Sequence, residues 1–167
     1  MKIEENSFYH IFNRGNNKGL IFFEERNYAY FLNRISTYLL PHASVICYCL
    51  MPNHFHLVVK VHHKEGFEKG IKNLFISYAK SINTAYKRVG YLFQGRYKAK
   101  QIDSEAYLLR SVVYIHQNPK AAQMVSHLEE YPHSSYRYFL KEEVSIVEKE
   151  SVLAWFGGLD GFVQSHL

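Results

Sequence analysis

Two β-rich runs in the middle of the chain constrain its fold more than any other feature. SVICYCL at 44–50 and HFHLVVKV at 54–61 are joined by a short segment that contains Pro52-Asn53. Branched and aromatic residues favour strands, whereas Pro and Asn are typical of turns. The pair therefore predicts a β-hairpin. A chain of 167 residues is long enough to bury a core around it.

The segments on either side of this hairpin alternate between strand and helix patterns. Apolar residues recur at helical spacing over 24–40 and 65–88. Strands are expected at 7–14, before the first helix, and at 95–102, after the second. The resulting order is β-α-β-β-α-β. It predicts an α+β, ferredoxin-like fold, in which helices cover one face of an antiparallel sheet.

The remaining third of the chain adds helices to this unit. Asp103 or Ser104 offers an N-cap for a third helix, which Pro119 is expected to close. After that helix the chain turns acidic, and SVLAWF is typical of a helical piece. We therefore predict a main domain over 1–140 and a helical C-terminal appendage over 141–167.

The net charge of +5 is distributed unevenly along the chain. Residues 60–120 contain twelve Lys and Arg but four Asp and Glu, and Tyr and Phe are interleaved with them. This composition favours a polyanionic partner, of which nucleic acid is the first candidate. The alternative is that the basic residues simply form a solvated, lysine-rich surface.

The chain carries no pattern typical of export. Its opening, MKIEENSFYH, lacks the apolar core of a signal peptide, and no apolar run approaches membrane-spanning length. Cys47 and Cys49 cannot build a disulfide framework. These features favour a cytoplasmic protein without a membrane partner.

His54 and His56 are the first candidates for chemistry. Residues two apart in a strand point to the same face, about 6–7 Å apart, so both imidazoles can reach one metal ion. One possible completion is a Cys2His2 zinc site with Cys47 and Cys49, if position 49 pairs with 54. Small buried cysteines without a ligand role are the simpler alternative.

A second possible completion comes from the helix at 104–119. Tyr107, Tyr114 and Asn118 fall along one stripe of it, whereas His116 points to the opposite side. Asn118 can add an amide oxygen to a metal held by the histidines, and Tyr114 a phenol beside it. Tyrosines on a helix face are also ordinary core residues, and Asn before Pro also terminates helices.

Three ordered segments give the chain a family resemblance. MPNHFHLVV, LFQGRYK and YIHQNPKAA resemble the single-tyrosine HUH transposases, and their REP-associated branch most of all. YHIFNRGNNKGLIF and YPHSSYRYF are similar to that branch too. The likeness covers about residues 8–138.

The resemblance implies a metal-dependent enzyme that cleaves and rejoins single-stranded DNA through a 5′-phosphotyrosine. It implies Tyr114 as the nucleophile. It also implies His54 and His56 as ligands of Mg²⁺ or Mn²⁺, with Asn118 as a third ligand where related members often have Gln. Tyr107, on the same helix stripe, is the substitute to test if Tyr114 is not the nucleophile.

The resemblance also implies partners. Single-stranded DNA with hairpin or palindromic elements is expected, and relatives include both monomers and homodimers in which the tyrosine helix serves the partner's histidines. The alternatives are a domesticated protein that binds DNA hairpins without cleaving them, and a zinc-stabilised interaction domain.

Four basic residues are candidates for DNA contacts. Arg14 lies in the turn FNRGNNKG, and Arg96, Lys98 and Lys100 alternate along the strand predicted at 95–102. Residues at this spacing share one strand face and can follow a phosphate backbone. Lysine protection of a sheet edge explains the same pattern without a ligand.

Overall fold

The computed structural model describes residues 2–167, and within them four strands form one sheet. The strands are β1 (Phe8–Arg14), β2 (Ala43–Met51), β3 (His54–Val61) and β4 (Lys98–Ile102). The helices are α1 (Glu25–Tyr38), α2 (Lys64–Ala85), α3 (Glu105–Ala121), α4 (Tyr136–Phe139), α5 (Lys149–Trp155) and α6 (Leu159–Ser165), with short 3₁₀ helices at Asn16–Lys18 and Leu128–Glu130. None of the helices in residues 2–167 has the length and apolar character needed to cross a membrane.

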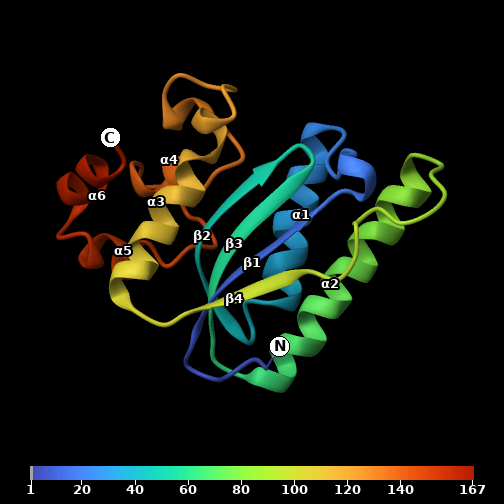
Figure 1. Cartoon of the computed structure of the whole chain (residues 1–167), viewed down its shortest axis with the longest axis horizontal. Helices are drawn as coiled ribbons and strands as arrows, with labels where there is room; N and C mark the ends of the chain where they lie inside the picture. Colours follow the sequence, from blue (N-terminus) through green and yellow to red (C-terminus); the bar gives the residue numbers. More distant parts are fainter. Residues whose placement is uncertain (1) are drawn as a thin grey trace.

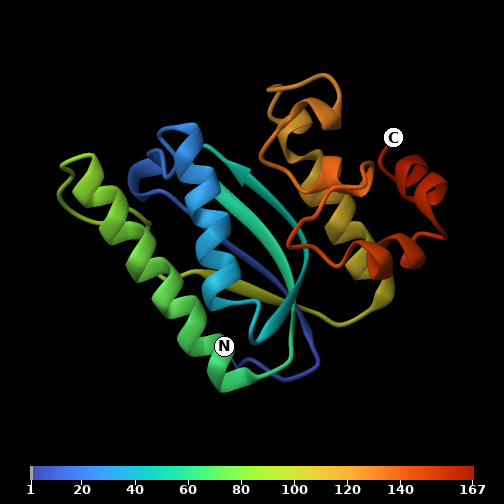
Figure 2. The ribbon, with the colours of Figure 1, turned by 180° about the vertical axis from the view of Figure 1, so that it is seen from behind.

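The sheet confirms the predicted ferredoxin-like α+β fold. Its strand order is β2-β3-β1-β4, and every neighbouring pair is antiparallel. Helices α1 and α2 cover one face, as Figure 1 and the view from behind in Figure 2 show. Helix α3 packs against β2 and β3.

Alternation along β3 gives the sheet two chemically different faces. Phe55, Leu57 and Val59 are buried, and Phe55 meets Phe31 of α1 at 5.1 Å and Phe75 of α2 at 5.7 Å between ring centroids. Burying a side chain of this size contributes about 1.5–3 kcal/mol. The core between sheet and helices therefore fixes which face the intervening histidines occupy.

Two predicted boundaries are wrong. Helix α3 runs through Pro119 to Ala121, because a proline removes a single N–H donor and the last turn keeps its other bonds, such as Ala122 N–H to Asn118 O at 3.0 Å. The strand expected at 95–102 begins only at Lys98. The Asn13 side chain donates to the Gly95 carbonyl at 3.0 Å, so a side chain holds this backbone in place of a ladder bond.

The C-terminal helices pack against α3. Val152 of α5 and Phe162 of α6 are fully buried and belong to the same hydrophobic cluster as the sheet. Figure 1 shows α4, α5 and α6 gathered around α3. The helical piece predicted near SVLAWF is present as α5. The division into 1–140 and 141–167 stays a prediction.

A buried chain of hydrogen bonds joins α6, α3 and β2. His166 Nδ1 lies 2.7 Å from the Phe162 carbonyl oxygen, so Nδ1 carries the proton and donates it. His116 Nδ1 then donates to His166 Nε2 at 2.9 Å. His116 Nε2 accepts from the Ser135 hydroxyl at 2.8 Å, and Ser135 accepts from the Tyr48 N–H at 2.9 Å. This chain fixes the rotation of α3 over the sheet.

The buried His116 should make stability depend on pH. Burial first, and His166 second, hold the pKa of His116 well below its ordinary value, whereas an unfolded histidine takes up a proton near pH 6.5. Protonation therefore favours the unfolded chain as the pH falls. We expect a loss of about 1 kcal/mol in unfolding free energy per such histidine between pH 6.5 and 5.5, because the unfolded imidazole is half protonated at the first pH and almost fully at the second.

Urea unfolding at both pH values measures this loss. His116→Gln should lose less stability on acidification than the wild type, because it has one fewer buried imidazole. His62→Gln, which removes a half-exposed histidine, is the matched control. Equal pH dependence in His116→Gln and wild type would show that this histidine contributes nothing to it.

Candidate active site

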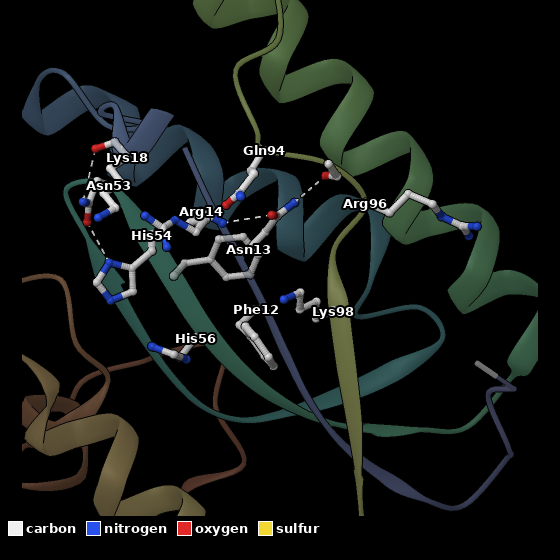
Figure 3. Close-up of a pocket in the computed structure, with 12 residues that line it drawn as sticks. Phe12, Asn13, Arg14, Lys18, Asn53, His54, His56, Gln94, Arg96 and Lys98 are labelled. Atoms are coloured by element: carbon white, nitrogen blue, oxygen red, sulfur yellow. Dashed lines mark hydrogen bonds between the residues drawn. The ribbon is translucent and has the colours of Figure 1, made fainter. Parts of the chain in front are cut away.

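The site lies on the sheet face opposite α1 and α2. In the antiparallel register, Arg14 of β1 pairs with His54 of β3, and Phe12 pairs with His56. Paired residues share a face, so Arg14, Phe12 and the next alternate residue, His10, lie on the same face as the two histidines. Figure 3 shows Phe12, Arg14, His54 and His56 around one cavity.

Helix α3 brings two of the predicted residues to this face. Asn118 Oδ1 lies 3.4 Å from His54 Nε2, and the Tyr114 ring lies 6.0 Å from the His56 ring between centroids. Tyr114 is 58 % exposed, which leaves its phenol accessible to a large substrate. His116, predicted to point to the side of the helix opposite Tyr114, is fully buried. The structure therefore brings Tyr114, His54, His56 and Asn118 together within one chain.

The tautomer of His54 follows from its neighbours. Asn53 Nδ2 donates to the Lys18 carbonyl at 3.3 Å, which orients the amide so that Asn53 Oδ1 faces His54 Nδ1 at 2.7 Å (Figure 3). His54 Nδ1 must therefore carry the proton, and Nε2 presents a lone pair toward the Asn118 oxygen. Burial lowers the pKa of His54, which keeps the ring neutral.

His56 is held by a third histidine that the sequence reasoning missed. His10 Nε2 lies 2.9 Å from His56 Nδ1. Burial lowers the pKa of His56 to about 3 and that of His10 to about 4, with Lys100 adding to the effect on His10. Alternation in FYHIFNR places His10 and Arg14 on one face. Once the pairing of β1 with β3 is known, this alternation identifies His10 as a neighbour of His56.

The donor set fits a divalent cation. Two acceptors, His54 Nε2 and Asn118 Oδ1, face each other across 3.4 Å. A cation between them would relieve their repulsion. Imidazole nitrogens and amide oxygens are ligands for metals such as Mn²⁺, and they add no negative charge. The side chains present therefore fit a site for Mg²⁺ or Mn²⁺ with open coordination positions.

The structure offers no support for the zinc alternative. Position 49 pairs with His56 rather than 54, and Cys47 pairs with Val58, so Cys49 has one histidine opposite it and Cys47 has none. Both thiols are fully buried, and burial raises their pKa, which disfavours the thiolate that zinc binds. Within residues 2–167 no three His, Cys, Asp or Glu side chains are grouped to hold a metal.

Two cavities flank His56. The first, about 590 Å³, is lined by His54, His56 and basic residues that include Arg14, Lys18 and Lys98. The second, about 430 Å³, lies on the α3 side. Its lining residues are His10, Phe12, His56, Lys100, Tyr107, Arg110, Ser111 and Tyr114. His56 therefore borders both spaces.

The predicted DNA-contact residues divide between these cavities. Lys98 pairs with Phe12 and Lys100 with His10, so both lysines lie on the histidine face. Arg96 also borders the first cavity, but Figure 3 shows its side chain extending away from the histidines.

Arg14 is exposed beside His54. The glycine after it has a role within the loop, because a Cβ on Gly15 would lie 1.9 Å from the Gly19 carbonyl oxygen. Gly15 thus lets the turn that follows Arg14 pack closely on itself.

Comparison with known proteins gives the class and the family. The model of a family described as "Transposase IS200 like" matches residues 5–118, more than half of the chain. No curated protein matches in sequence. The family match places the chain among the transposases, a class of DNA-processing enzymes. More narrowly, the chain belongs to the IS200-like transposase family, which confirms the predicted kinship.

A solved structure supports the same fold. A structure described as a REP-associated tyrosine transposase bound to a REP hairpin matches with a TM-score of 0.72. The match covers 89 % of this chain and 94 % of that one at 12 % sequence identity. At this identity the likeness shows the fold, and the match extends the common architecture over most of the chain.

His10 should strengthen metal binding by orienting His56. Removing a partner that orients a metal ligand typically costs about 10- to 100-fold in affinity. We expect His10→Ala to weaken Mn²⁺ binding by that factor and His54→Ala to weaken it further, as measured by calorimetric titration. His62→Ala, beyond the far end of β3, is the control. Wild-type affinity in His10→Ala would remove His10 from the site.

Proposed function

We propose that the chain is a metal-dependent transposase that cleaves and rejoins single-stranded DNA through a 5′-phosphotyrosine. The observation that carries the proposal is the convergence of Tyr114, His56, His54 and Asn118 on one accessible face. The basic cavities on either side of His56 support a nucleic-acid strand as the substrate.

Tyr114 supplies the nucleophile. Its phenolic oxygen attacks the phosphorus, the new O–P bond forms, and the bond from phosphorus to the 3′-oxygen breaks. The phenol loses its proton to water at the exposed ring, and the leaving 3′-oxygen takes up a proton to become a hydroxyl. Rejoining reverses these steps, because the phosphotyrosine bond retains the energy of the bond that was broken.

The metal ligands are matched to this reaction. A divalent cation bound by His54, His56 and Asn118 would polarise the phosphate oxygens and stabilise the phenolate. The three ligands are neutral, so they leave the charge of the cation available. Asn53 and His10 hold the two imidazoles in place from their other ring nitrogens.

We propose that Tyr114 acts on DNA held by the histidines of its own chain. The 6.0 Å between the Tyr114 and His56 rings supports this arrangement. The buried contacts of His116 with Ser135 and His166 hold α3 in that position. A homodimer that exchanges α3 is therefore not needed to complete the site.

Single-stranded DNA with hairpin elements is the proposed substrate. An unpaired backbone can bend so that the attacking and leaving oxygens lie in line at the phosphorus, which a duplex resists. The REP hairpin bound in the similar solved structure is consistent with a folded element beside the cleavage site.

Tyr114→Phe tests the proposal most directly. It removes one oxygen from a mostly exposed ring, so we expect unchanged folding and DNA binding but no denaturation-resistant adduct with a labelled single-stranded hairpin library in Mn²⁺. Tyr107→Phe, on the same helix and bordering the same cavity, is the matched control and should keep the adduct.

The reverse pattern would make Tyr107 the nucleophile. Binding without an adduct in the wild type would instead indicate the hairpin-binding alternative.

Lys98 and Lys100 should contribute electrostatic binding. Each phosphate contact adds about 0.7 to the slope of log affinity against log salt for single-stranded DNA. We expect Lys98→Gln with Lys100→Gln to lower this slope by about 1.4. Lys69→Gln with Lys80→Gln, both exposed on α2, is the charge-matched control. Equal slopes for the two double variants would place the DNA path elsewhere.

A further inference from the structure

A groove separates α3 from the C-terminal helices on the far side of Tyr114. It has a volume of about 710 Å³. Leu109 and Val113 of α3 line one wall, and Trp155 and Phe156 line the other. The proposed chemistry makes no use of this groove.

Tyr114 and Arg110 connect the groove to the candidate active site. Both side chains border the groove, and both also border the cavity that contains His56 and Lys100. The proposed nucleophile therefore stands on a ridge between the two spaces. A nucleotide bonded to the Tyr114 oxygen could therefore extend into the groove or into the cavity beside His56.

The chemistry of the groove suits a nucleotide. Trp155 and Phe156 provide aromatic surface for a base, and Arg110 provides a cation for a phosphate. No acidic residue is among the described residues that line it. Trp155 is half-buried and meets Phe8 of β1 edge-on at 5.8 Å between ring centroids, which holds its ring against the sheet.

We propose that this groove binds the nucleotide on the 3′ side of the scissile phosphate. This inference rests on the proposed function, because that nucleotide is the one whose 5′-phosphate becomes joined to Tyr114. The other product leaves with a free 3′-hydroxyl. The attached nucleotide must stay close to the Tyr114 ring, and the groove is the aromatic space that Tyr114 borders away from the histidines.

Stacking makes the groove a sequence-tolerant site. Every base has an aromatic face, and stacking on an aromatic side chain is a general means of holding single strands. The groove would keep the covalently attached strand in place while the first product is exchanged for the strand to be joined.

Trp155 is the only tryptophan of the chain, so its fluorescence reports on the groove. The probe is tetrathymidylate with a 5′-phosphate, added to the full-length Tyr114→Phe variant so that no cleavage occurs. We expect saturable quenching. Tetrathymidylate with a 3′-phosphate should bind more weakly, and deoxyribose 5-phosphate, which has no base, should not quench.

Two variants test the lining. Arg110→Glu, at an exposed position that leaves the core intact, should weaken binding at least tenfold, whereas Lys120→Glu on the same helix should not. In competition with a labelled oligonucleotide, Trp155→Ala should weaken binding at least about fivefold, and Trp155→Phe should retain most of the affinity.

Three results would overturn the proposal: no quenching by any oligonucleotide, equal binding of the 5′- and 3′-phosphorylated probes, or wild-type affinity in Arg110→Glu. These outcomes are separate from failure of the proposed function. If the adduct requires Tyr114 but the groove binds no oligonucleotide, Tyr114 is the nucleophile and the proposed nucleotide site is wrong. If an adduct forms without Tyr114 but quenching persists, the groove is a nucleotide site and the nucleophile is wrong.

Discussion

The pairing of β1 with β3 is the constraint on which the rest of the structure depends. Alternation along β3 turns Phe55 and Leu57 toward the two long helices, and this burial compels His54 and His56 to the opposite face. A slip of one residue would exchange the two sets and bury the imidazoles in an apolar core. The hydrophobic core and the reactive face are thus consequences of one register.

The second requirement is that α3 hold its position above that face. Tyr114 and Asn118 are on the surface of α3, but the position of the helix is set by what lies beneath and behind it. His116 contacts His166 at the end of α6, and it contacts Ser135, which in turn accepts from the Tyr48 N–H of β2, so the helix is tied to both elements. The C-terminal helices therefore help to orient the proposed nucleophile.

The candidate metal ligands of the site are neutral side chains in basic surroundings. Burial disfavours protonation of both histidines, and the Arg14 charge adds to this at His54, so their lone pairs remain available for a cation. Lys98 and Lys100 lie on the same face, where the proposed function has them contact the phosphates of the DNA strand.

The sequence alone determined the order of elements and the stripe that carries Tyr114 and Asn118, because both follow from local periodicity. It also determined the family, through ordered motifs. Only the tertiary structure decided the role of His10, because that role depends on which strand pairs with β3. It also decided the burial of the cysteines, because α3 covers them. The groove at Trp155 was equally beyond prediction. It is formed by segments about forty residues apart, and no local pattern reports that they meet.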